Sequence, residues 1–407
     1  SQDNEIISRF MRGGFWRNFF SKYSESNRMN KRMIFVSNMI GEITESNYKE
    51  KENALEYLLK GQCNCPYWHG TFGGLYLNNL RHATYSNLIK AASISLEKIY
   101  GRKYFLSHNL DFDMDGRDEI MISCENSGLI FHTLSGSIIE WDLKKENPIN
   151  LIDCIKRREE AYHIAALRNS NNKNDDNEHV SIHEIGKKID DNIAKYLVFD
   201  KNEKVFGVDH FLNKMPSAEE FQLLKYEENA DFYKLHYDNV ENLINKDYAT
   251  VSYEKISKVN GKDIRLMKRY IVNNDGSFHI ESIIENKSNE DTEFVYALEN
   301  NITLLAGNEP DRYYIGGDKK ISNNLSYCGE YSGTVFGMAD EGYIKVKILM
   351  EASEETEFLY MPNFTISDAV DKLEMNYQNS TIVCCRKTYL KANEKIIYKI
   401  KVIVKDI

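Results

Sequence analysis

The 407-residue sequence lacks three features that would each identify a class of protein. No apolar run approaches the roughly 20 residues that a helix needs to cross a bilayer, so membrane insertion is excluded. Lys and Arg number 52 against 62 Asp and Glu, and the net charge of -10 argues against a general affinity for nucleic acid or anionic lipid. The seven cysteines show no complete zinc-binding spacing, and we expect reduced thiols.

The composition is that of a globular protein. Hydrophobic residues make up 42% of the chain and charged residues 28%, which is too apolar for a disordered chain. The first ten residues carry charges where a signal peptide has its apolar core, so we expect a cytoplasmic protein. The sequence begins with Ser instead of Met, and we expect that its start is cut.

The N-terminal quarter has the periodicity of helices. Four apolar residues at i, i+4, i+7 and i+11 define one face of a first helix: Met29, Met33, Val36 and Ile40. A second helix is expected over residues 52–60 and a third over residues 75–99. The apolar side of the second helix is expected to hold Ala54, Leu55, Leu58 and Leu59.

After Arg102 the period changes to two, which indicates strands. Alternation is clearest at 343–348 and 397–404, and shorter runs recur at 128–141, 249–253, 278–284, 294–305 and 381–389. We predict an α+β fold with a three-helix segment over residues 1–100 and a large antiparallel β-sandwich over residues 101–407. Residues 169–177 contain no apolar side chain, so a flexible loop is expected near 169–178.

The densest cluster of unusual side chains lies between Asn64 and His69. Tyr67 and Trp68 offer flat apolar faces, while Asn64 and His69 offer hydrogen-bond donors and acceptors. A pyranose ring combines an apolar C–H face with a rim of hydroxyls, so a sugar suits this loop. The alternative is that the aromatic rings pack in a core and that His69 is a buried, hydrogen-bonded imidazole.

A second signal is an acidic loop between two expected strands. Its carboxylates stand at positions 1, 3, 5 and 9: Asp111, Asp113, Asp115 and Glu119. Gly116 stands at position 6, and Arg117 at position 7 offers its backbone oxygen, so the loop can wrap a Ca²⁺ ion. The expected role is structural, pinning the first hairpin of the sandwich. The alternative is a solvated acidic turn without metal.

Several segments together resemble one known family. Residues 13–23 (GGFWRNFFSKY), 62–64 (QCN) and 67–77 (YWHGTFGGLYL) are similar to the section that follows the catalytic carboxylates in glycoside hydrolase family 57. Residues 140–142 (EWD), 157–163 (RREEAYH) and 208–212 (VDHFL) resemble the C-terminal domain of its α-amylase and 4-α-glucanotransferase members.

The resemblance implies a catalytic barrel with a Glu nucleophile and an Asp acid/base, a helical region that completes the substrate cleft, and a sandwich similar to galactose mutarotase. No segment here resembles the motifs of either catalytic carboxylate, so we expect that these residues alone do not cleave or transfer glucan. The resemblance assigns substrate contacts to Asn64, Tyr67, Trp68 and His69. Cys65-Pro66 stand where relatives are expected to carry an acidic and a small residue.

We therefore expect the C-terminal, non-catalytic portion of an α-1,4-glucan-acting enzyme, with maltooligosaccharide and the catalytic barrel as partners and no organic cofactor. The barrel-facing side of the helices is expected to be apolar and to drive self-association. The alternatives are a stand-alone carbohydrate-binding module and a sugar epimerase. Epimerisation needs a His and a Glu as acid and base, but no spacing brings His163, His210, Glu299 and Trp141 together, so structural roles are expected for them.

Overall fold

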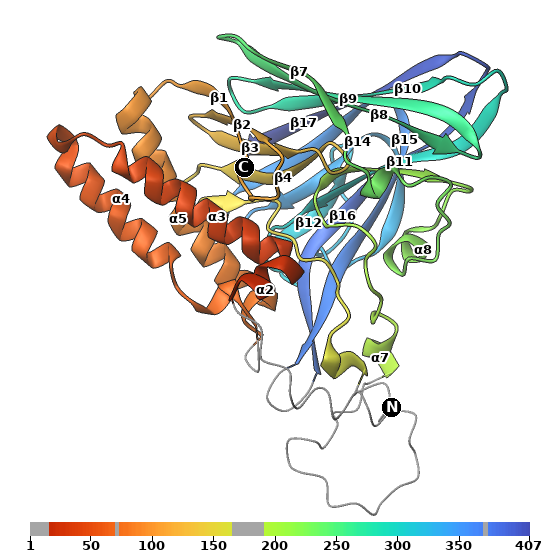
Figure 1. Ribbon diagram of the computed structural model, residues 1–407. Coiled ribbons are helices and arrows are strands. Elements are labelled where there is room, and N and C mark those ends of the chain that lie inside the picture. The colour runs from red at the N-terminus through yellow and green to blue at the C-terminus, as the bar shows by residue number, and fades with distance from the viewer. Residues whose placement is uncertain (1–15, 70–72, 165–190, 369–372) are drawn as a thin grey trace, which may run out of the picture.

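The structure is a computed structural model that describes residues 16–69, 73–164, 191–368 and 373–407. A group of helices packs beside a large antiparallel sheet assembly (Figure 1). Four helices follow one another near the N-terminus, a short one and three long ones: α2 (Trp16–Lys22), α3 (Ser24–Gly41), α4 (Tyr48–Gly61) and α5 (Asn78–Tyr100). Short helices come later, among them α7 (Asp191–Ala194) and α8 (Ala218–Gln222). The loop predicted near residues 169–178 lies outside the described residues. Among the described helices, none is both long and apolar enough to cross a membrane.

The three predicted helices are confirmed as α3, α4 and α5, and the short α2 precedes them. The predicted face of α3 is also confirmed. Met29, Val36 and Ile40 are buried, and Met33 is partly buried against the cluster that holds Val36 and Ile40. An apolar stripe repeating every three or four residues therefore faces the neighbouring helices, as the sequence periodicity indicated.

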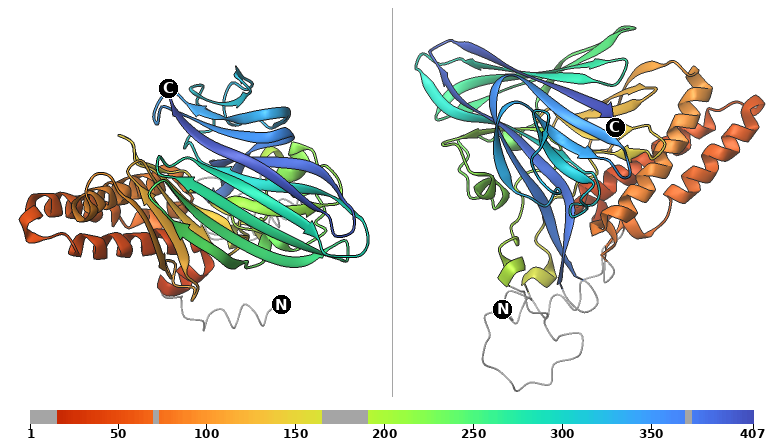
Figure 2. Two further views of the ribbon diagram at one scale, coloured as in Figure 1. Left: turned by 90° about the horizontal axis from the view of Figure 1, so that it is seen from above. Right: turned by 180° about the vertical axis from the view of Figure 1, so that it is seen from behind.

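The apolar side predicted for α4 is wrong at two positions. Ala54 and Leu58 are buried, but Leu55 and Leu59 are 44% and 58% exposed. The buried pair belongs to one cluster with residues of α3 and α5, whereas α4 forms the outer edge of the helical group (Figure 2). A helix that is covered from one side only buries a narrow stripe, so the leucines next to that stripe face solvent.

Seventeen strands in the described residues form one continuous antiparallel sheet that folds into two layers. The first strands are β1 (Phe105–Leu110), β2 (Glu119–Cys124), β3 (Ser127–His132), β4 (Ser137–Leu143), β5 (Ile149–Asn150), β6 (Phe206–Leu212), β7 (Asp238–Ile244), β8 (Tyr248–Val259) and β9 (Lys262–Asn273). The remaining strands are β10 (Phe278–Asn286), β11 (Thr292–Ile302), β12 (Arg312–Gly316), β13 (Lys319–Lys320), β14 (Gly329–Asp340), β15 (Val346–Asp368), β16 (Leu373–Leu390) and β17 (Lys395–Asp406).

The long strand β15 joins the two layers. Its first part, residues 346–352, pairs with β17, and its second part, residues 357–368, pairs with β16. Through β17 it continues into β10, β9, β8 and β7, whereas through β16 it continues into β11 and β6. One extended core fills the space between the layers, with Trp141 packed edge-on against Phe206 and Phe278.

Buried ion pairs join the helical region to the sandwich. Arg81 of α5 donates to Asp153 at 2.7 Å, and both side chains are buried. Arg32 of α3 is paired with Asp142 of β4, also within the buried interface. Because a buried charge is tolerated only with a partner in place, each pair holds the helices in one position against the strands.

Candidate functional site

The loop predicted to bind a sugar connects α4 to α5 through two 3₁₀ turns, Cys65–Tyr67 and Gly74–Tyr76. Tyr67 is buried, and its hydroxyl donates to the Gly61 carbonyl at 2.7 Å. Trp68 is 39% exposed, and Asn64 is also exposed. The two neighbouring aromatic residues therefore differ: Tyr67 packs beneath the loop, and Trp68 presents its ring at the surface.

Gly74 sets the path of the backbone under Trp68. Its φ is +44°, and an added Cβ would lie 2.1 Å from the Trp68 carbonyl oxygen. That carbonyl accepts the Leu75 N–H at 2.8 Å, and the hydroxyl of Ser26 donates to the Tyr67 carbonyl. A side chain at position 74 would break this close approach, which explains a glycine here. The loop around Trp68 is thus held from both sides.

His69 lies beside a buried carboxylate, Glu160, that we did not single out from the sequence. Its Nε2 is 2.5 Å from the Tyr23 hydroxyl and 3.7 Å from Glu160. Glu160 accepts hydrogen bonds from the hydroxyls of Tyr23 and Tyr76 at 2.7 and 2.8 Å, and from Lys22 at 2.7 Å. Tyr23 and Glu160 are 137 positions apart, so no local pattern could pair them. The resemblance of residues 157–163 was the one signal near Glu160.

This cluster holds an ionised carboxylate next to a neutral imidazole. Burial alone would raise the pKa of Glu160, but hydrogen bonds from Lys22, Tyr23 and Tyr76 lower it below the ordinary value. Burial lowers the pKa of His69. The carboxylate is 5% exposed and fully engaged, so its evident role is to fix Tyr23 and, through it, the imidazole beside Trp68.

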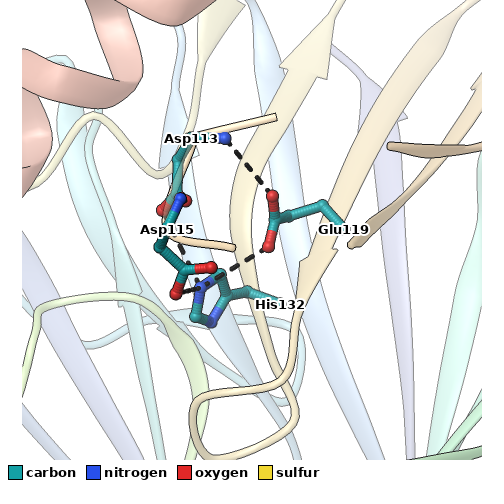
Figure 3. A group of neighbouring side chains, drawn as sticks. All are labelled: Asp113, Asp115, Glu119 and His132. Carbon is teal, nitrogen blue, oxygen red and sulfur yellow. Dashed lines mark hydrogen bonds and ion pairs between the residues drawn. The ribbon is translucent and has the colours of Figure 1, made fainter. Parts of the chain in front are cut away.

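The acidic loop lies between β1 and β2, as predicted, and it meets a histidine from β3 (Figure 3). The Nε2 of His132 is 3.8 Å from Asp113, 3.6 Å from Asp115 and 3.6 Å from Glu119. His132 was not predicted from the sequence, because only the hairpin of β2 and β3 brings it back to the loop.

Two residues of the predicted metal set do not join this group. Asp111 accepts the Gly116 N–H at 3.2 Å, and the side chain of Arg117 is exposed beside Asp115. The group that the structure brings together is Asp113, Asp115, Glu119 and His132. A linear count of loop positions cannot tell which carboxylates turn inward, so it included Asp111 and could not find His132. The backbone oxygen of Arg117 stays a predicted ligand.

Two family models match the chain. The alpha-amylase/4-alpha-glucanotransferase middle domain matches residues 14–95, and the C-terminal domain of the same name matches residues 111–400. The chain belongs to this family. It is glycoside hydrolase family 57, as the sequence resemblance indicated.

Known members of the α-amylase/4-α-glucanotransferase family agree with the match. An alpha-amylase of Pyrococcus abyssi is 34% identical over 79% of this chain and 45% of its own length. The 4-alpha-glucanotransferase of Thermococcus litoralis has a solved structure that aligns with 98% of this chain and 52% of its own, with a TM-score of 0.73 at 24% identity. A galactose mutarotase-like protein of Clostridium acetobutylicum is a more distant neighbour, with a TM-score of 0.44 at 10% identity over 75% of this chain and 99% of its own. The predicted α+β sandwich is confirmed. The chain spans about half the length of the curated relatives it matches.

The structure of this family member brings His210 and Glu299 together, although no spacing in the sequence indicated it. The Nε2 of His210 is 2.9 Å from Glu299, and its Nδ1 is 2.5 Å from Glu228. Lys204 donates to the other oxygen of Glu299 at 2.8 Å. His163 lies elsewhere and pairs with the Ile366 carbonyl. His210 and Glu299 are both fully buried, so a sugar does not reach them, which favours the structural roles expected from the sequence.

The buried His210 predicts a pH dependence of stability. Burial alone would lower its pKa, but the carboxylates of Glu228 and Glu299 raise the pKa of His210 to about 9. The folded pKa lies above the unfolded value of about 6.5, so this stabilisation is present below pH ~6.5 and is lost as the pH rises to ~9. We expect the free energy of unfolding to fall by up to about 3 kcal/mol across this window, measured by urea denaturation.

A matched variant isolates this contribution. In Glu228→Gln, one of the two charges that hold the proton on His210 is removed while the side chain keeps its shape, so the fall between pH 6.5 and 9 is expected to shrink. His279→Gln is the control, because His279 is only part-buried and its pKa is lowered by burial. An unchanged pH slope in Glu228→Gln would contradict the assignment to His210.

Proposed function

We propose that this chain forms the accessory, non-catalytic portion of an α-1,4-glucan-acting enzyme, and that the loop around Trp68 contacts the glucan. The observation that carries the proposal is Trp68 itself, a 39% exposed indole on a braced loop within the matched middle domain. Asn64 is exposed on the same loop, and His69 adjoins Trp68 with its imidazole held by Tyr23.

The physical support lies in how sugars bind. A glucose ring buries its C–H face against an aromatic plane, and its hydroxyls pair with nearby amide and imidazole groups. A loop that is already fixed loses little conformational freedom on binding, which leaves more of the contact energy for affinity. We place Asn64, Trp68 and His69 on the sugar and Tyr67 beneath the loop as its support.

We place the contact with the catalytic barrel on the helical region. Tyr48, Leu55 and Leu59 of α4 are spaced seven and four positions apart, which puts them on one side of the helix, and all three are exposed. Apolar side chains gathered on one helix face usually mark a contact surface. Without a covering partner, the same surface is where self-association of the isolated chain is expected.

The decisive variant is Trp68→Ala. Loss of the indole removes a stacking contact worth about 1.4 kcal/mol or more, so the affinity for maltoheptaose is expected to fall at least about tenfold. Isothermal calorimetry on the 407-residue chain measures it. Tyr327→Ala is the matched control, because Tyr327 is an exposed aromatic of the sandwich, far along the chain from the loop. Equal affinities in Trp68→Ala and the unmodified chain would reject the role of Trp68.

The non-catalytic assignment has its own test. Purified chain incubated with maltoheptaose is expected to leave its length distribution unchanged on chromatography, since no pair of carboxylates here matches the catalytic motifs. Shorter or longer products would overturn the assignment. Polarimetry with a freshly dissolved sugar anomer tests the epimerase alternative in the same preparation, and acceleration of mutarotation would favour that alternative.

A further inference from the structure

The acidic loop between β1 and β2 concentrates negative charge that has no role in the proposed binding of glucan. One carboxylate oxygen each from Asp113, Asp115 and Glu119, together with a ring nitrogen of His132, lie within 4.8 Å of one another (Figure 3). Three carboxylates this close repel one another, so the group holds its negative charge at a free-energy cost when no counter-ion is bound.

Glu119 supplies an independent sign of a ligand. Its side chain is fully buried, and its Oε2 accepts the N–H groups of Phe112 and Asp113 at 2.8 and 3.3 Å. The other oxygen, Oε1, is buried without a hydrogen-bond partner and points toward Asp115 and His132 (Figure 3). Buried acceptors are nearly always satisfied, so this oxygen indicates a missing partner inside the group.

The hydrogen bonds of His132 decide which kind of ion fits. Its Nδ1 accepts the Leu134 N–H at 2.8 Å, so the proton of the neutral ring resides on Nε2 and faces the carboxylates. A protonated nitrogen is a donor and cannot ligate a metal. The ligands are therefore oxygens only, which favours a hard cation over zinc or copper.

We propose that Asp113, Asp115 and Glu119 bind one calcium ion, with the Nε2–H of His132 facing their carboxylates from outside the ligand shell. Asp115 lies toward solvent, so water can complete the six to eight oxygen ligands typical of calcium. This calcium site does not depend on whether the chain binds glucan. The inference therefore goes beyond the proposed function.

The ion would also link the two parts of the molecule. The side chain of Asn27 in α3 donates to the Asp113 carbonyl at 2.7 Å, so the acidic loop is already in contact with the helical region. Glu119 begins β2 and His132 ends β3. An ion here fixes the first hairpin and the loop that α3 touches, which gives the site a structural role.

The test uses the full chain after treatment with chelator, with calcium, magnesium and zinc as probes. We expect calorimetry to show one calcium ion per chain, and the unfolding midpoint to rise by a few degrees at calcium concentrations about 100 times the dissociation constant. No heat and no shift with calcium up to about 10 mM, beyond the range of weak calcium modules, would overturn the proposal.

Two variants separate the site from general charge effects. Glu119→Gln keeps the shape of the side chain and removes its charge, so calcium affinity is expected to fall at least about tenfold while the metal-free midpoint does not fall. Asp118→Asn is the control, because Asp118 is exposed in the same loop and lies outside the group, and it should bind calcium normally. Equal losses in both variants would contradict the assignment. Zinc binding that is tighter than calcium binding and lost in His132→Gln would overturn the oxygen-only ligand set.

Discussion

Replacing Arg81 with methionine is expected to destabilise the chain by about 3–5 kcal/mol, which is the usual effect of leaving one partner of a buried ion pair uncompensated. The guanidinium of Arg81 is buried and contacts both parts of the molecule. It donates to Asp153 at 2.7 Å, to the Leu75 carbonyl at 2.5 Å and to Gln378 at 2.9 Å. Methionine fills much of the same volume but removes the Arg81 donor from the Asp153 carboxylate and from three further acceptors, one of which is the Asp153 carbonyl. Urea denaturation followed by circular dichroism measures the loss.

The control for Arg81 lies on the surface of the same helical region. Arg102 follows the end of α5 and pairs with Glu97 at 3.0 Å, but both side chains face solvent. Exposed pairs of this kind contribute about 0–1 kcal/mol, so Arg102→Met is expected to leave the unfolding free energy nearly unchanged. If Arg81→Met behaved like Arg102→Met, the helices would be held to the sandwich by apolar contacts alone.

The helices and strands were predictable because their signals are local. The i, i+4, i+7 spacing on α3 and the strict alternation along β17 each depend on residues within one element. The exposure of Leu55 and Leu59 was not predictable, because periodicity identifies an apolar side but not how much of it a neighbour covers. The strand predicted from residue 343 begins at Val346, where Lys345 adopts a positive φ of 60°. Such boundaries are set by turns that the alternation does not reveal.

The candidate sites show the same division between local and distant contacts. The acidic loop was visible in the sequence, because its carboxylates all lie within nine residues. The contact of His69 with Glu160 was not, since it joins segments from the two parts of the fold. Lys268 is a further example of a contact that the sequence does not reveal. It occupies an inward position of β9 amid apolar neighbours, and its partner is Asp209 at 2.7 Å. From a sequence, a charged residue is predicted to lie at the surface unless a buried partner is known.

The second large effect is expected at Glu299, the centre of the other buried network. Its carboxylate accepts hydrogen bonds from Lys204 at 2.8 Å, His210 at 2.9 Å and Asn202 at 3.1 Å. Although burial opposes it, the charge of Lys204 and the hydrogen bond from His210 hold the pKa of Glu299 well below its usual range. Glu299→Ala leaves a buried ammonium and an imidazole without their shared partner, so a loss of about 3–5 kcal/mol is expected in urea denaturation.

A double replacement tests whether the loss of stability in Glu299→Ala comes from buried charges that are left without their partner. Lys204→Met together with Glu299→Leu removes both charges and keeps apolar volume, so its loss is expected to be smaller than the sum of the two single losses. Glu293→Ala is the control on the same strand, because Glu293 is exposed, and it should change stability by less than about 0.5 kcal/mol. Strictly additive losses would mean that Lys204 and Glu299 act independently. In that case the low pKa of Glu299 would have to come from His210, and the pH dependence predicted for His210 would shrink in Glu299→Leu, where Glu228 alone remains to hold the proton on His210.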